Sequence, residues 1–158
     1  MSKASSRTLV VALEATPGAV PEARRAVSAV AVAGGANGED LERISLAVSE
    51  AVTNAVVHAY GDSPVGFIHL LAAAAEGELS VLVADDGCGL GQAPQSPGLG
   101  LGMGVIEYSV DSLAITTRAS GGTIVEMRFS LSEHEPKPAR AALAAQLHGS
   151  VASAITST

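Results

Sequence analysis

Three polar side chains recur at a spacing of four residues in the segment SEAVTNAVVHAY, residues 49–60. On a helix, Glu50, Asn54 and His58 would lie within about 80° of each other. An amide oxygen such as that of Asn54 is a hard ligand of the kind that Mg²⁺ prefers. The carboxylate of Glu50, one turn earlier, can accept a proton from an attacking hydroxyl. The stripe therefore indicates either the solvated face of an amphipathic helix or a site for Mg-dependent chemistry.

A second group of candidate residues follows the apolar segment ELSVLVA, in the run DDGCGLG. Asp85 would close a strand there, and Gly87 and Gly89 allow a tight turn whose backbone can approach a flat ligand. A buried carboxylate accepts a hydrogen bond from an exocyclic amine, which adenine carries. The run therefore indicates either an ordinary turn after a strand or the edge of an adenine pocket.

Glycines are also dense in the run GLGLGMG, which leads into a segment with helical spacing. Gly98, Gly100 and Gly102 would place backbone amides at the start of that helix, where a phosphate can bind. A flexible hinge is the alternative. The sequence contains neither GxxxxGKS/T nor GxGxxG, and its only lysines are Lys3 and Lys137. Bound phosphates would therefore need a metal ion to neutralise their charge.

The elements that must position these groups follow from hydrophobic spacing. A β-branched run at 8–14 predicts a strand, and residues 21–33 predict a first helix that ends at a pair of glycines. Asn37 and Asp40 resemble a capping pair, after which a second, long helix is predicted up to Gly61. Its apolar face consists of Leu41, Ile44, Val48, Val52 and Ala55.

The second half of the chain predicts a sheet interrupted by one helix. Residues 65–75 and 78–87 predict a hairpin, and a Gly- and Pro-rich loop at 87–98 leads into a third helix. Residues 112–119 and 123–131 predict two further strands joined by the turn SGG. This order favours an α/β (α+β) two-layer sandwich, a mostly antiparallel mixed sheet covered on one face by about three helices.

Composition restricts the classes of function. The 158-residue chain suits one domain with a single core, which we assign to residues 1–132, followed by a Pro- and Ala-rich tail at 133–158. A formal net charge of −7, with two Phe, two Tyr and no Trp, argues against a cationic, aromatic-lined nucleic-acid groove. A single cysteine, no secretion leader and no apolar run of membrane-spanning length predict a cytoplasmic protein with no membrane partner.

Together the three motifs closely resemble those of the GHKL (histidine-kinase-like) ATPase superfamily. The pattern ExxxNAxxHAY matches its N box, DxGxG its first glycine box and GLGM its second, and the resemblance covers residues 8–131. Within the superfamily, the bacterial anti-sigma-factor serine/threonine kinases fit best, because LAVSEAVTNAVVHAY is similar to the N box of that branch. The resemblance implies a Bergerat-type ATP-binding fold with ATP and Mg²⁺ as cofactors.

The resemblance also assigns roles to individual residues. It implies that Glu50 is the catalytic base, that Asn54 coordinates Mg²⁺ and that Asp85 binds adenine. The other nucleotide-binding residues that it implies are His58, Gly87, Gly89, Gly98, Gly100, Leu101, Gly102, Met103 and Thr123. An additional glycine, Gly104, follows the second box, so the register of that box could differ by two residues.

The activity that the resemblance implies is phosphorylation of a STAS-type anti-anti-sigma protein by a chain that also sequesters a sigma factor and so regulates transcription. A homodimer is compatible with it. Residues 87–98 contain no Lys or Arg that could offer a cation to the transferred phosphate. A nucleotide-gated regulator that binds its partner without kinase activity is therefore the alternative function, and an α+β domain whose glycines are hinges is a third.

Overall fold

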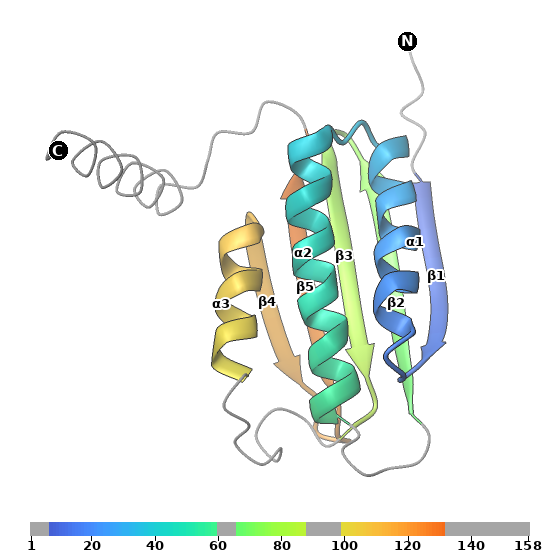
Figure 1. Ribbon diagram of the computed structural model, residues 1–158, viewed down its shortest axis with the longest axis vertical. Helices are drawn as coiled ribbons and strands as arrows, with labels where there is room; N and C mark the ends of the chain where they lie inside the picture. The colour runs from blue at the N-terminus through green and yellow to red at the C-terminus, as the bar shows by residue number, and fades with distance from the viewer. Residues whose placement is uncertain (1–6, 60–65, 88–98, 132–158) are drawn as a thin grey trace, which may run out of the picture.

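The computed structural model describes residues 7–59, 66–87 and 99–131, and all their side chains except those at 58, 59 and 99–101 (Figure 1). The predicted tail at 133–158 lies outside this part of the chain. The elements are β1 (Arg7–Glu14), α1 (Ala19–Ala33), α2 (Gly38–Asn54), the π-helical turn η1 (Ala55–Ala59), β2 (Phe67–Ala75), β3 (Glu78–Asp85), α3 (Leu99–Ser109), β4 (Ser112–Thr117) and β5 (Thr123–Ser130).

The five strands form one sheet in the order β1-β2-β3-β5-β4. Every pairing between these strands is antiparallel, which confirms the predicted antiparallel sheet and shows no parallel pair among the described strands. Glu76 and Gly77 form the turn between β2 and β3 and have φ values of 52° and 77°, as a two-residue hairpin turn requires. Asp85, the last residue of β3, lies opposite Ile68 of β2.

Helices α1, α2 and α3 pack side by side on one face of the sheet, as Figure 1 shows. Three residues of the predicted apolar face of α2, Ile44, Val48 and Val52, are fully buried. Sheet residues with the same burial are Ile68, Ala72, Leu79, Val81, Met127 and Phe129. A two-layer α+β sandwich results, with its core between the helices and the sheet, as the sequence predicts.

Both ends of α2 can be explained from its residues. At its start, Asn37 Oδ1 accepts a hydrogen bond from Asp40 N at 2.9 Å, and Asn37 N donates to Asp40 Oδ2 at 3.2 Å, which confirms the capping pair. At its end, the predicted α-helix is wrong in detail, because residues 55–59 form a π-helical turn. A π-turn takes about one residue more than an α-turn, so residues beyond Asn54 leave the regular α-helical register.

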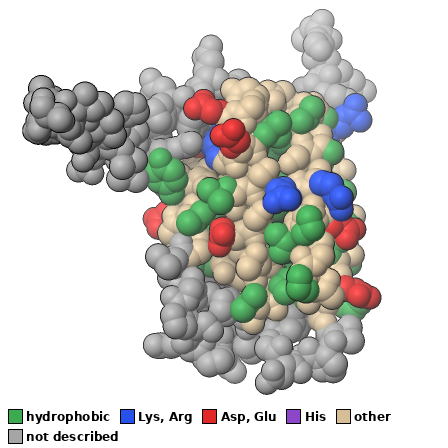
Figure 2. Space-filling view, viewed as in Figure 1, with side chains coloured by type: hydrophobic (Ala, Val, Ile, Leu, Met, Phe, Trp, Pro, Cys, Tyr) green, Lys and Arg blue, Asp and Glu red, His purple; other side chains and the backbone are tan. Residues whose placement is uncertain are grey.

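The outer surface of the helices is chemically mixed. Figure 2 shows this face, where apolar side chains lie among Arg, Asp and Glu side chains rather than in one continuous patch. Exposed apolar side chains on the helices are Val32, Leu46, Val57 and Tyr108. Within the ranges that the structure describes, no helix is both long enough and apolar enough to span a bilayer.

Candidate functional site

Asp85 lies at the end of the central strand β3, and its side chain is almost fully buried. Its Oδ1 accepts hydrogen bonds from Gly87 N at 2.9 Å and from Thr123 N at 3.3 Å. Among the described residues, both bonds to this carboxylate fall on Oδ1, so Oδ2 can accept a bond from a ligand. The structure therefore brings together Asp85, Gly87 and Thr123, three of the residues to which the resemblance assigns nucleotide binding.

Burial has a clear electrostatic effect on Asp85. Desolvation raises the pKa of its carboxyl group above the ordinary value of 3.8, although the two backbone hydrogen bonds and the nearby Arg118 lower it in part. A buried carboxylate with an available oxygen is a strong acceptor for a neutral N–H donor.

The turn between β4 and β5 packs directly against Asp85. Gly121 and Gly122 both have a φ of 93°, which favours glycine. A Cβ at Gly122 would lie only 2.1 Å from Asp85 O, so no side chain fits there. These glycines, from the turn SGG, thus allow the β4–β5 hairpin to close over the end of β3.

Arg118, at the start of this turn, is a residue that sequence reasoning missed. Its Nη2 donates to Asp85 O at 2.6 Å and to Asp86 Oδ1 at 2.5 Å. The Arg118 bond, followed by a bond from His69, lowers the pKa of the Asp86 carboxyl group, and slight burial opposes this. The sequence predicts Arg118 within the strand at 112–119, whereas β4 ends at Thr117. Its contact with Asp85 joins residues 33 positions apart, so no local pattern in the sequence indicates it.

Glu50 and Asn54 lie on the side of α2 that packs against α3. Both are half-buried rather than exposed. A Cβ at the buried Gly102 of α3 would lie 3.1 Å from Glu50 Oε2 and 3.3 Å from Asn54 Oδ1. At these two positions the polar stripe therefore faces another helix, and the absence of a side chain at Gly102 lets α3 approach without displacing Glu50 or Asn54.

The chemistry of these two side chains fits a Mg²⁺ ion held together with a ligand. Asn54 Oδ1 is a hard oxygen, and the Glu50 carboxylate is one turn away. Asn54 Nδ2 is buried without a hydrogen-bond partner in the described part of the chain, so it is a donor that an oxygen of a bound ligand would satisfy. The described residues contain no cluster of three or more His, Cys, Asp or Glu that would form an all-protein metal cage. Mg²⁺ usually has few protein ligands and completes its shell with phosphates and water.

Asp85 and the pair Glu50 and Asn54 lie at the same end of the molecule. Figure 1 shows the C-terminal ends of α2 and β3 side by side there, and β3 contacts η1.

Gly100 and Leu101 lie in the first turn of α3, and Met103 is partly buried against the core. His58 lies in η1, and its side chain is outside the description. Gly89 and Gly98 also lie outside the described residues, so their predicted roles stay predictions.

Two glycines of α3 provide a matched test of this packing. Gly102→Ala is expected to weaken ATP binding about tenfold, because its Cβ meets Glu50 and Asn54 at 3.1–3.3 Å and displaces them. Gly104→Ala meets nothing within 4 Å, so it should leave binding unchanged and stabilise the fold by about 0.5–1 kcal/mol through helix propensity. Isothermal titration with ATP and chemical denaturation of both variants measure these effects. Equal affinities of the two variants would contradict the proposed contact.

Comparison with known proteins decides the family. The sequence profile described as histidine kinase-like ATPase domain matches residues 13–129. The chain belongs to this family. An anti-sigma F factor from Clostridium novyi (strain NT) is 32% identical over 108 residues, which cover 61% of this chain and 76% of the relative. An anti-sigma F factor from Heyndrickxia coagulans is 30% identical over 97 residues, covering 54% of this chain and 66% of the relative.

Two other similar proteins have chains much longer than the region that matches. Blue-light-activated histidine kinase 2 from Erythrobacter litoralis (strain HTCC2594) is 37% identical over 102 residues, which are 61% of this chain and 30% of that kinase. A crystal structure of RsbU and RsbW domains from Mycobacterium tuberculosis is similar to this chain with a TM-score of 0.64 and 28% identity, covering 82% of this chain and 34% of that one. The sequence-based resemblance to the GHKL superfamily and its anti-sigma branch is thereby confirmed.

Proposed function

We propose that this chain binds Mg-ATP, sequesters a sigma factor and phosphorylates a serine of a STAS-type anti-anti-sigma protein. The observation that carries the proposal is the meeting of Glu50, Asn54 and Gly102 at the end of the sandwich where Asp85 closes β3. An acceptor for adenine, an amide oxygen for Mg²⁺ and a carboxylate base at one end of one domain would support ATP binding and phosphoryl transfer.

The adenine half of the proposed site rests on Asp85. Its Oδ2 would accept a hydrogen bond from the exocyclic amine of adenine while Oδ1 is held by Gly87 N and Thr123 N. Guanine has a carbonyl oxygen at the equivalent position, and two acceptors facing each other would repel. The site is therefore expected to prefer ATP to GTP.

The phosphate half rests on α2 and α3. Asn54 would hold Mg²⁺, which supplies positive charge to the phosphates when it is bound. Glu50, one turn earlier on the same face, would accept the proton of the serine hydroxyl as the hydroxyl attacks the γ-phosphate. Half-burial beside α3 keeps this carboxylate partly away from water.

The partners are proposed from the relatives. Several of the similar proteins are anti-sigma F factors, and the similar solved structure contains an RsbW domain. Because the matched region contains the whole candidate site, the same division of roles is proposed for this chain, with a sigma factor bound and a STAS protein phosphorylated.

A second function is favoured by the positions of the cations. Residues 87–98 contain no Lys or Arg. Arg43 is buried near the opposite end of α2, and Arg118 is bonded to Asp85 and Asp86 on the adenine side. Neither contacts Glu50 or Asn54 in the described part of the chain. A regulator whose partner affinity depends on bound ATP, without phosphate transfer, is therefore the alternative proposal.

Two measurements on the wild-type chain test these proposals. Calorimetric titration with ATP, with and without Mg²⁺, is expected to give Mg-dependent binding. Incubation of a STAS protein with radiolabelled ATP is then expected to transfer the γ-phosphate to serine. Binding with no transfer, but with ATP-dependent capture of the partner, would favour the regulator. No nucleotide binding by folded protein would contradict both.

A further inference from the structure

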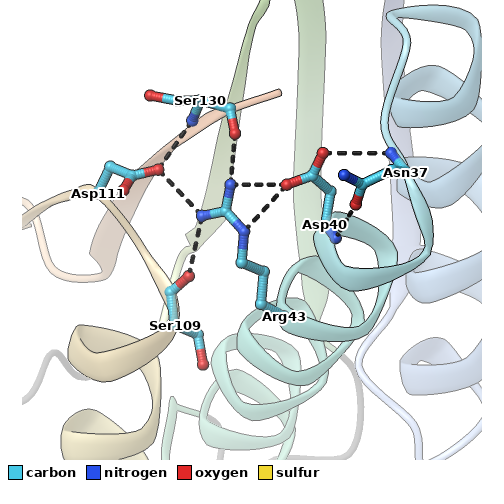
Figure 3. Close-up of polar contacts among 6 residues, drawn as sticks. All are labelled: Asn37, Asp40, Arg43, Ser109, Asp111 and Ser130. Atoms are coloured by element: carbon cyan, nitrogen blue, oxygen red, sulfur yellow. Dashed lines mark hydrogen bonds and ion pairs between the residues drawn. The ribbon is translucent and has the colours of Figure 1, made fainter. Parts of the chain in front are cut away.

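Arg43 of α2 is a buried cation whose hydrogen-bonding capacity is fully used. Its side chain is 4% exposed. Nε and Nη2 donate to Asp40 Oδ1 at 3.3 and 3.0 Å, and Nη2 also donates to Ser130 O. Nη1 donates to Asp111 Oδ2 at 3.0 Å and to Ser109 O at 3.5 Å. All five N–H donors of a guanidinium group are therefore engaged (Figure 3).

The partners of Arg43 come from separate elements. Figure 3 shows the guanidinium group at the centre, with Asp40 on its own helix and the other partners reaching in from α3, β5 and the α3–β4 connection. Asp111 Oδ2 also accepts from Ser130 N at 2.8 Å, which closes the network. The Arg43 guanidinium carbon lies 5.5 Å from the centre of the Phe129 ring. Arg43 thus holds the C-terminal end of α3 onto α2 and β5.

The opposite end of α3 belongs to the candidate site. Gly102, in the first turns of this helix, packs against Glu50 and Asn54. The helix has 11 residues and is therefore about 16 Å long. Its contacts are extensive with α2 and sparse with β4. A rigid helix held on one neighbour at both ends transmits a displacement of one end to the other.

We propose that Arg43 is a positioning residue for phosphate recognition: by fixing the C-terminal end of α3, it sets how the N-terminal end lies against Glu50 and Asn54. This inference rests on the proposed ATP-binding function. Asp85 and Thr123 lie on the sheet and have no hydrogen bond to this network. Recognition of adenine is therefore independent of Arg43, whereas recognition of the β- and γ-phosphates depends on it.

A comparison of two ligands tests the proposal. Arg43→Met should weaken ATP binding at least tenfold while leaving adenosine binding, followed by NMR titration, within about twofold of wild type. Val27→Ala is the matched control, because Val27 is fully buried in α1, which packs against α2 and β1. It destabilises the core without touching α3 and should change neither affinity, provided both variants are measured at a temperature where they are folded.

Since Arg43→Met leaves Asp40 and Asp111 without their cation, it could fail to fold. Asp111→Ala is the second variant, because Arg43 keeps its bonds to Asp40 and Ser109 while the carboxylate that joins the α3–β4 connection to Arg43 and to Ser130 N is lost. It should weaken ATP binding about threefold or more and leave adenosine binding unchanged.

Measuring both ATP and adenosine distinguishes failure of the proposal for Arg43 from failure of the proposed ATP-binding function. A folded Arg43→Met or Asp111→Ala protein with wild-type affinity for ATP would overturn the proposal and leave Arg43 a purely structural residue. Equal losses for ATP and adenosine would also overturn it, because they indicate general loosening of the domain. Wild type that binds neither ligand would instead overturn the proposed function.

Discussion

Glu50→Gln is expected to lower the rate of phosphate transfer to a STAS protein by about 10²–10⁴-fold while ATP affinity stays within a few-fold of wild type. Gln has nearly the same shape as Glu, so the close contact with Gly102, 3.1 Å from Glu50 Oε2 to a Cβ there, can be kept. Its amide cannot take the proton of the attacking hydroxyl. Single-turnover transfer with radiolabelled ATP, together with calorimetric titration, measures the two quantities separately.

A matched control comes from the same helix. Glu42 is exposed on α2, so Glu42→Gln makes the same chemical change away from the site. Its transfer rate and ATP affinity should both equal those of wild type. If Glu50→Gln transferred phosphate as fast as Glu42→Gln, Glu50 would not be the base, and the proposed mechanism would have to be abandoned.

The parts of the fold that could be predicted from the sequence are those with local causes. The capping box of Asn37 and Asp40 involves residues three apart, and the hairpin turn at Glu76 and Gly77 depends on two backbone conformations. Hydrophobic periodicity likewise reports on neighbouring residues of one helix or strand. The π-helical turn after Asn54 was not predicted, because its sequence, AVVHA, does not differ in apolar pattern from a continuing α-helix.

The parts that could not be predicted depend on contacts between distant residues. Arg43 and Asp111 are 68 positions apart, and Arg118 and Asp85 are 33 apart. In the sequence, each of these four residues lies in a segment whose hydrophobic spacing gives no information about its partner. The site motifs were found only because several short patterns occurred in order along one chain. Which oxygen of Asp85 is held by the backbone and which is available to a ligand follows only from the closed hairpin.

Asp85→Asn is expected to weaken ATP binding about 100-fold, because a hydrogen bond to a charged acceptor contributes up to about 3 kcal/mol and each 1.4 kcal/mol is tenfold in affinity. The Asn side chain can keep the two bonds from Gly87 N and Thr123 N on its oxygen. Its NH₂ group then occupies the position of Oδ2 and faces the amine of adenine, donor against donor. Calorimetric titration of ATP and GTP measures the loss, and an unchanged affinity for ATP would remove Asp85 from the adenine site.

The same substitution should not destabilise the fold, which separates loss of binding from loss of structure. Burial raises the pKa of the Asp85 carboxyl group in the folded state. The protonated carboxyl group therefore stabilises the fold at low pH, and this stabilisation is lost as pH rises from below 3.8 through the raised folded-state pKa. Asn is neutral at every pH in this range. The free energy of unfolding of Asp85→Asn should therefore increase relative to that of wild type as pH rises through this range. Asp86 has a lowered pKa, so Asp86→Asn should show the opposite trend and retain ATP binding. Denaturation from pH 3 to 7 measures both trends. A marked loss of stability of Asp85→Asn at pH 7 would show that the ionised carboxylate is a structural requirement of the β3 end rather than an acceptor kept for a ligand.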